Sequence, residues 1–189
     1  MNFENNKILI IGGSGFIGGH LFSKLSQKNK VFIIDLKANN SNDQFKMDIK
    51  KKIKNLNELN NIDLIINLAA IHKEPGHEDY EYFETNIKGA ENVCEFAENI
   101  GCKNIIFTSS IAPYGIEDKL KDETTVPQPV TAYGSSKLQA EKIHVAWQKK
   151  DEANRILTIV RPGIVFGKFE NANMYRLVKL VHKRFFFFM

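Results

Sequence analysis

Short apolar runs alternate along this chain with longer segments in which apolar residues recur at every third or fourth position. Such runs, rich in β-branched residues and bounded by glycine or polar residues, are typical of buried strands. The clearest periodic segment extends from about Tyr80 to Ile100 and meets Gly101 as a stop signal, which predicts a helix with one apolar face. The predicted strands lie within residues 7–11, 30–36, 44–49, 63–70, 101–110 and 155–167.

Strands that alternate with helices predict an α/β fold, in which a doubly wound parallel sheet is covered on both faces. In such a sheet, ligands bind beyond the carboxyl ends of the strands. The 189 residues are 43% hydrophobic, which is enough to bury the core of one domain.

The end of the chain departs from this organisation. A helical pattern over residues 173–184 runs into the sequence FFFFM at residues 185–189, with no closing polar element. Four adjacent phenylalanines would expose a large apolar surface, so we expect a further portion of the protein to cover them. The alternative is a terminal strand that is buried in the same domain or in a homodimer.

Charge and cysteine content narrow the function classes. Lysine and arginine exceed aspartate and glutamate by 26 to 22. The lysines within residues 50–54 predict a helix face that is exposed to solvent. Because no aromatic residues interleave with these lysines, we expect no nucleic-acid partner. Two cysteines, Cys94 and Cys102, favour reduced thiols over a disulfide framework or a zinc site. With no secretion signal and no apolar run of membrane-spanning length, the sequence predicts a cytoplasmic protein without a membrane partner.

A glycine-rich bend follows the first predicted strand. Gly12, Gly15 and Gly18 form G-x-x-G-x-x-G at the start of a helix, where free backbone N–H groups attract a pyrophosphate and the absence of Cβ atoms lets it approach. Asp35 ends the second strand about twenty residues later, as a dinucleotide fingerprint requires. Its carboxylate would accept hydrogen bonds from ribose hydroxyls and repel a 2′-phosphate, which favours NAD over NADP, although the nearby Lys37 weakens that preference.

Three further residues suggest proton and hydride chemistry. Tyr133 and Lys137 are four positions apart, so a helix would place them on one face, and Ser110 follows the fifth predicted strand. Lowering the pKa of a tyrosine from about 10 to near 7 requires roughly 4 kcal/mol, which one lysine charge at about 4 Å supplies at an effective dielectric constant near 20. Ser110 would hold the substrate oxygen while Tyr133 takes its proton and NAD takes hydride from its carbon.

The ordered series of motifs resembles the extended short-chain dehydrogenase/reductases, specifically the NAD-dependent epimerase/dehydratase branch that acts on nucleotide sugars and has a Rossmann fold. The motifs are the glycine triplet, Asp35, MDI at 47–49, NLAA at 67–70, TNIKGAENV at 85–93, SSIAPYG, YGSSK and RPGIVFG. The resemblance implies catalytic Ser110, Tyr133 and Lys137. It implies a cofactor site formed by Gly12, Gly15, Phe16, Ile17, Gly18, Asp35, Asp48, Ile49, Leu68, Ala69, Ala70, Asn86, Tyr133, Lys137 and Pro162, with no metal.

Three departures from the family pattern are relevant here. Ile111 and Ala112 stand where the family's sugar dehydratases carry an Asp-Glu pair, which disfavours dehydration, and Asn67 stands where a histidine is frequent. The family's enzymes usually continue into a smaller C-terminal domain that binds the sugar nucleotide. Residues 1–189 therefore resemble the NAD-binding domain, with about the last fifteen residues leading into an absent substrate domain.

The leading hypothesis is an NAD-dependent nucleotide-sugar epimerase that acts at sugar C4 on a UDP-sugar through a transient keto sugar. The alternatives are an NAD(P)-dependent dehydrogenase or reductase of the same family, and a non-catalytic dinucleotide-binding module. We expect His72 and His77 to be exposed to solvent, His144 to be a surface or packing residue, and Trp147 to anchor the core.

Overall fold

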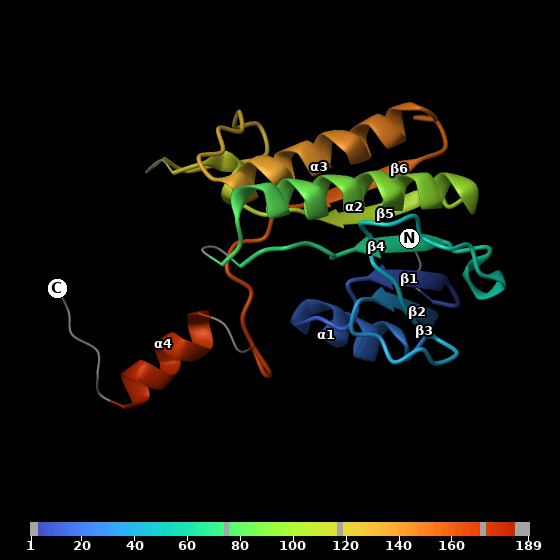
Figure 1. Ribbon diagram of the computed structural model, residues 1–189, viewed down its shortest axis with the longest axis horizontal. Helices are drawn as coiled ribbons and strands as arrows, with labels where there is room; N and C mark the ends of the chain where they lie inside the picture. Colours follow the sequence, from blue (N-terminus) through green and yellow to red (C-terminus); the bar gives the residue numbers. More distant parts are fainter. Residues whose placement is uncertain (1–3, 74–75, 117–118, 171–172, 184–189) are drawn as a thin grey trace.

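Six parallel strands form one sheet in the computed structural model, which describes residues 4–73, 76–116, 119–170 and 173–183 (Figure 1). The strand order is β3-β2-β1-β4-β5-β6. The order reverses at β1, which pairs with β2 on one side and β4 on the other, so the carboxyl ends of these strands border a topological switch point. The strands are β1 (Lys7–Ile11), β2 (Lys30–Asp35), β3 (Gln44–Lys46), β4 (Leu64–Asn67), β5 (Asn104–Thr108) and β6 (Ile156–Val160).

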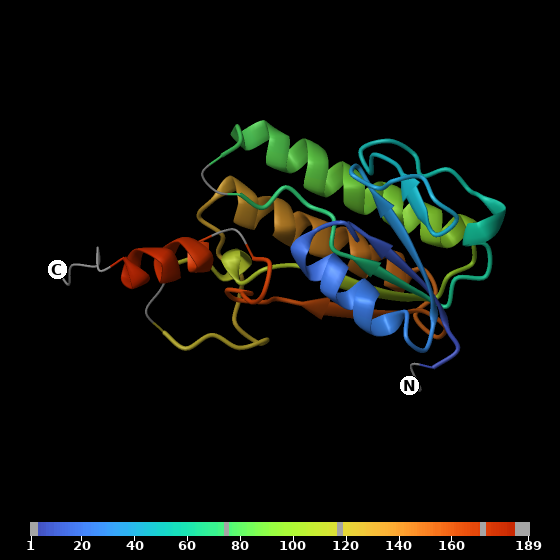
Figure 2. The ribbon, with the colours of Figure 1, turned by 90° about the horizontal axis from the view of Figure 1, so that it is seen from below.

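Helices cover both faces of the sheet, which confirms the doubly wound α/β fold. Helices α2 (Asp79–Asn99) and α3 (Ala132–Lys149) lie side by side on one face, and α1 (Phe16–Leu25) lies on the other (Figures 1 and 2). The short 3₁₀ helices η1 (Asn57–Leu59) and η2 (Ala112–Tyr114) follow β3 and β5. The last helix, α4 (Asn173–His182), extends away from the sheet in both views.

The larger core lies between the sheet and the helix pair α2 and α3. Trp147 is only 1% exposed there, as expected of a core anchor, and Cys94 and Cys102 are both buried with free thiols. A smaller core joins β1, β2 and β4 to α1. The outer face of β6 stays open, because Ile156 and Val160 are 50% and 43% exposed.

Local signals set the ends of the long helices. The backbone N–H of Glu78 donates to the Glu81 side chain at 2.9 Å, which satisfies a donor at the start of α2. Gly101 follows α2 with φ +70°, a left-handed conformation that ends a helix at low cost and matches the predicted stop. At α3, the hydroxyl of Thr131 accepts from the backbone N–H of Gly134 at 3.0 Å.

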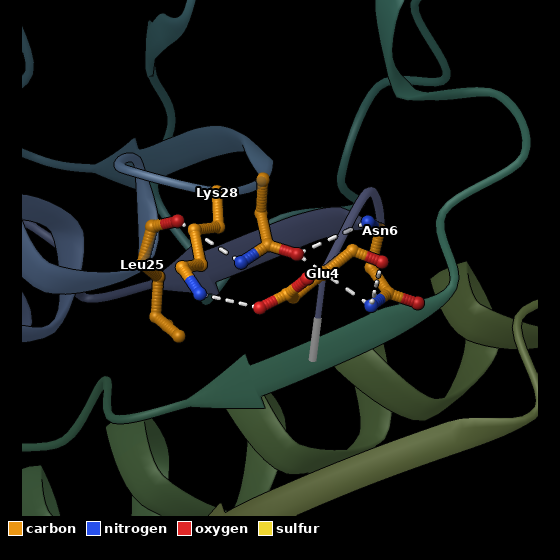
Figure 3. A network of polar contacts seen from close by, with 5 residues as sticks. Glu4, Asn6, Leu25 and Lys28 are labelled. Carbon is orange, nitrogen blue, oxygen red and sulfur yellow. Dashed lines mark hydrogen bonds and ion pairs between the residues drawn. The ribbon is translucent and has the colours of Figure 1, made fainter. Parts of the chain in front are cut away.

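A polar network at the amino end of β1 fixes the edge of the sheet opposite the switch point (Figure 3). The backbone N–H of Asn6 donates to Asn29 Oδ1 at 3.0 Å, and Asn29 Nδ2 donates to the Leu25 carbonyl at 3.0 Å. Lys28, in the turn between α1 and β2, forms an ion pair with Glu4, which precedes β1. The network ties the chain before β1 to the turn between α1 and β2.

The prediction of a helix over residues 50–54 was wrong. The lysines there are exposed, as expected, but they lie in a turn and an irregular segment. Asp48 Oδ1 accepts from the Lys50 backbone N–H at 2.9 Å, a local bond that competes with helix formation. Lys52 instead pairs with Glu95 on α2 at 2.8 Å.

Exposed apolar side chains line α4. Leu177, Val178, Leu180 and Val181 are between 41% and 58% exposed. The phenylalanine run at 185–188, on which the interpretation of the chain end depended, lies outside the described residues.

Candidate active site at the carboxyl edge of the sheet

The glycine loop between β1 and α1 requires at least two of its glycines for steric reasons. Gly12 has φ +86°, and a Cβ there would lie 2.8 Å from the backbone nitrogen of Ala69. A Cβ on Gly18 would lie 2.6 Å from the carbonyl oxygen of Gly12. Gly15 is the exposed N-cap of α1 and offers no side chain to its first turn. The start of α1 therefore presents backbone N–H groups that an anion can reach closely.

Asp35 lies beside this loop, where its spacing in the sequence predicted. One carboxylate oxygen accepts from the Ser14 backbone N–H at 3.0 Å, and the other accepts from the Lys37 backbone N–H at 2.8 Å. The carboxylate is thus held at the tip of β2 by two backbone donors. Lys37 contributes its backbone to this arrangement, and its side chain is exposed.

The segment after β4 closes against the glycine loop. Leu68, Ala69 and Ala70 are half-buried, and Ala69 is the residue that excludes a Cβ from Gly12. Asn86 of α2 braces the segment: its side chain accepts from the Ile71 backbone N–H at 2.9 Å and donates to the Ile71 carbonyl at 3.1 Å.

Asn86 also connects this segment to α3. Its Nδ2 donates to the hydroxyl of Ser136 at 2.9 Å, and Ser136 is fully buried. Sequence reasoning did not single out Ser136. The available signal was its position directly before Lys137 within the YGSSK motif.

The two residues after β3 have different surroundings. Asp48 is half-buried and holds the Lys50 backbone N–H, as described above. Ile49 is 8% exposed, and its side chain packs under Gly89, where a Cβ would lie 2.4 Å from Ile49 Cδ1. The Ile49 carbonyl accepts from Asn92 Nδ2 at 2.6 Å. The side chain of Ile49 therefore belongs to the core.

Ser110, Tyr133 and Lys137 all lie at the carboxyl end of β5. Ser110 follows this strand, and its hydroxyl accepts from the Ala112 backbone N–H at 3.1 Å. Gly134 allows the start of α3 to pack closely against η2, since a Cβ there would lie 2.8 Å from the Ala112 carbonyl oxygen. Lys137 Nζ donates to the Thr108 carbonyl, at the end of β5, at 2.7 Å.

Tyr133 lies in the first turn of α3, one helical turn before Lys137. It is half-buried, and its ring centroid lies 6.0 Å from that of Tyr82 on α2. Helix α3 packs on η2, and Lys137 anchors it to the end of β5. These contacts place the helix turn of Tyr133 at the carboxyl end of β5, which Ser110 follows.

The Lys137 ammonium is deeply buried, with 2% of the residue exposed. Burial lowers the pKa of Lys137 to about 7, and the carboxylate of Glu141 acts in the opposite direction. Lys137 Nζ also lies 4.3 Å from the centroid of the Phe107 ring, a cation–π distance. The charge on this lysine therefore changes near neutral pH, whereas that of an exposed lysine does not.

A buried ion pair supports this part of α3. Glu141 accepts two hydrogen bonds from Arg161, at 2.9 Å from Nε and 2.6 Å from Nη2. The Arg161 guanidinium lies 4.6 Å from the centroid of the Tyr114 ring in η2. The pair joins α3 to the residue that follows β6, and no local sequence pattern indicates it.

The segment after β6 passes the start of α1. The Pro162 carbonyl accepts from the Ile111 backbone N–H at 3.2 Å, next to Ser110. Five residues later, Gly167 approaches the ring of Phe16, with 3.6 Å between its Cβ position and Phe16 Cζ. Phe16 and Ile17 are half-buried in the first turn of α1. Residues 162–167 thus extend from the carboxyl end of β5 to the glycine loop.

His72 and His77 have the solvent exposure that was expected of them. His77 lies 3.4 Å from the Glu81 carboxylate. Within the described ranges, no three His, Cys, Asp or Glu side chains gather where they could hold a metal ion. No helix in this part of the chain has both the length and the apolar character that crossing a bilayer requires.

The strand order, the glycine loop at the switch point and the acidic residue at the tip of β2 define a doubly wound protein of the dinucleotide-binding class. A family model for the NAD dependent epimerase/dehydratase family matches residues 8–185. The chain belongs to this family.

Curated relatives include two epimerases. The chain is 33% identical over 179 residues to the N-acetyl-alpha-D-glucosaminyl-diphospho-ditrans,octacis-undecaprenol 4-epimerase of Escherichia coli O157:H7, covering 94% of this chain and 54% of the relative. It is 30% identical over 153 residues to a UDP-glucose 4-epimerase of Streptococcus mutans serotype c, covering 72% of this chain and 45% of the relative. The chain spans about half the length of these relatives.

Solved structures show the same architecture with ligands. UDP-glucuronic acid 4-epimerase from Bacillus cereus in complex with NAD superposes with a TM-score of 0.80 at 25% identity, covering 94% of this chain and 63% of that structure. MoeE5 in complex with UDP-glucuronic acid and NAD gives a TM-score of 0.79 at 26% identity, covering 92% and 60%.

Proposed function

We propose that this chain is the NAD-binding and catalytic portion of a nucleotide-sugar 4-epimerase. The observation that carries the proposal is the burial of Lys137 against the end of β5, one helical turn from Tyr133 and beside the turn that holds Ser110. A lysine that served only as an exposed partner on a helix surface would stay in water. The family membership and the 4-epimerase relatives support the reaction class.

The carboxyl edge of the sheet fits NAD. The first turn of α1, with glycine at positions 12, 15 and 18, would hold the pyrophosphate, and the Asp35 carboxylate would accept the ribose hydroxyls. The Asp48 carboxylate is the acceptor that we assign to the adenine amino group. Leu68, Ala69 and Ala70, together with Pro162, would line the cleft toward the nicotinamide end.

In the proposed reaction, bound NAD supplies a reversible hydride acceptor for the sugar C4 carbon. Tyr133 takes the proton of the C4 hydroxyl, and the Ser110 hydroxyl donates a hydrogen bond to the same oxygen. If the charged form of Lys137 comes to about 4 Å from the phenolate, it would stabilise the phenolate by roughly 4 kcal/mol at an effective dielectric constant near 20. Tyr133 would return its proton to the C4 oxygen when hydride is given back to the opposite face of the keto sugar, which would invert C4.

The residues after Ser110 favour epimerisation over dehydration. Ile111 is 52% exposed, and Ala112 uses its backbone N–H to bind Ser110. Neither side chain can accept or donate a proton, so this position offers no acid or base for the elimination of water.

The test compares Tyr133→Phe with Tyr80→Phe, which removes the hydroxyl of a tyrosine that is 67% exposed on α2. Both variants are assayed against a panel of UDP-sugars, in this chain and in any longer product of the same gene. We expect Tyr133→Phe to retain NAD binding and to lose about 10²–10⁴-fold in epimerisation rate, and Tyr80→Phe to retain both. Full activity of Tyr133→Phe would refute the proposal, and release of NADH during turnover would assign a dehydrogenase instead.

A further inference from the structure

A buried histidine meets the end of β4. His144 lies on α3, two helical turns after Lys137, and none of its surface is exposed. Its Nδ1 lies 2.8 Å from the Ala140 carbonyl oxygen, and its Nε2 lies 3.4 Å from Asn67 Nδ2. Because a carbonyl oxygen only accepts, Nδ1 carries the proton in this contact, and Nε2 is left as the acceptor for the Asn67 amide.

The imidazole thereby determines which way the Asn67 amide points. With Nδ2 facing His144, Oδ1 faces the other way and accepts from the Ala69 backbone N–H at 3.3 Å. The backbone nitrogen of Ala69 in turn lies 2.8 Å from the position that a Cβ on Gly12 would take. A directional chain of contacts therefore runs from α3 through the end of β4 to the glycine loop.

The surroundings of His144 keep this series of hydrogen bonds in one orientation. Its ring stacks on Phe107 with 4.1 Å between centroids and 14° between planes, and the same Phe107 ring contacts the Lys137 ammonium. Burial lowers the pKa of His144 to about 4; the nearby charge of Lys137 acts in the same direction, and that of Glu141 opposes it. The imidazole is therefore neutral near pH 7, with its acceptor lone pair available to Asn67.

We propose that Asn67 and His144 form a positioning pair, which holds the Leu68–Ala70 segment in place against the glycine loop and so prepares the NAD site. Neither residue is proposed to touch the cofactor; both act through Ala69. The proposal rests on the proposed function, because it assigns NAD to this cleft. It differs from a packing role for His144, since the position of the ring nitrogen matters in addition to the volume of the ring.

The experiment is a double-mutant cycle on NAD affinity. His144→Phe keeps a ring on Phe107 but removes the acceptor, and Asn67→Ala removes the amide. We expect each single variant to weaken NAD binding about tenfold by calorimetry, as for the loss of one hydrogen bond, and the double variant to bind no more weakly than either. Native affinity in His144→Phe, or losses that multiply in the double variant, would overturn the pairing.

A second readout does not depend on NAD. Hydrogen exchange of the Ala69–Ile71 amides is expected to be faster in His144→Phe than in the wild-type chain, and unchanged exchange there would contradict the proposal. If the wild-type chain binds no NAD, the proposed function fails, while the exchange rates still decide the pairing. His144→Gln retains an acceptor oxygen, so the Ala69–Ile71 amides are expected to exchange as slowly as in the wild type. This variant is also expected to bind NAD within about threefold of wild type. Failure of this rescue in a folded variant would count against the pair.

Discussion

Replacement of Lys137 by methionine should change how the stability of this protein depends on pH. Lys137 is 2% exposed as a residue, and burial lowers the pKa of its ammonium from 10.5 to about 7. Methionine has a similar length and no charge, so it can occupy the same buried space between α3 and β5 without titrating. The substitution isolates the contribution of one buried proton site.

The size of the effect follows from the two pKa values. Between pH 7 and pH 9, the unfolded chain keeps the Lys137 proton because its pKa is near 10.5, whereas the folded chain loses it as the pH rises through about 7. Stability rises with pH wherever the unfolded state binds more protons. At about 1.4 kcal/mol for each pH unit and close to one proton, the gain is about 2 kcal/mol over this range.

Urea unfolding at pH 7, 8 and 9 measures this gain. We expect the free energy of unfolding of the wild type, relative to Lys137→Met, to increase by about 2 kcal/mol from pH 7 to pH 9. Lys142→Met is the matched control, because it removes an exposed lysine from the same helix and should leave the pH dependence of the wild type unchanged. A constant difference between wild type and Lys137→Met across the range would show that Lys137 is not buried as described.

Three other predictions test the site. Gly18→Ala places a methyl group 2.6 Å from a loop carbonyl and should lower both the melting temperature and NAD affinity. Its control, Gly19→Ala, meets nothing within 4 Å and should raise stability by about 0.5–1 kcal/mol. An unchanged melting temperature in Gly18→Ala would contradict the packing. Arg161→Lys should lower the free energy of unfolding by about 1–3 kcal/mol, because one ammonium cannot replace both hydrogen bonds to Glu141, and equal urea midpoints would refute this. Asp35→Ala should weaken binding of NAD more than binding of NADP in calorimetry, and an unchanged ratio would argue against its role in cofactor choice.

The strands could be predicted because the sheet is parallel and its central strands β1, β2 and β4 are buried on both faces. Such strands appear as continuous apolar runs, and all six were found from the sequence. Their ends were less well defined, since β6 covers only residues 156–160 of the predicted 155–167. Pro162 and Gly163 follow closely and do not favour continued pairing. The lysine segment at 50–54 was misassigned because the local bond from Asp48 is not visible in hydrophobic periodicity.

The candidate site divides in a similar way. The glycine loop, Asp35 and the Tyr133–Lys137 spacing depend on local sequence and could be located in advance. The Glu141–Arg161 and Asn67–His144 contacts join residues 20 and 77 positions apart, so only the folded chain reveals them. The low pKa of Lys137 depends on burial by several elements, which no local motif encodes. The assignment of individual residues to the cofactor and to catalysis stays a prediction.

The hydrogen-exchange footprint of NAD on this chain tests the cofactor site most directly. If NAD binds there, exchange becomes slower at residues 12–18 and 68–71, at the carboxyl ends of the strands, and stays unchanged at residues 4–6 and 27–30, at their amino ends. Absence of protection at the glycine loop under saturating NAD, or protection confined to the amino ends, would contradict this placement of NAD.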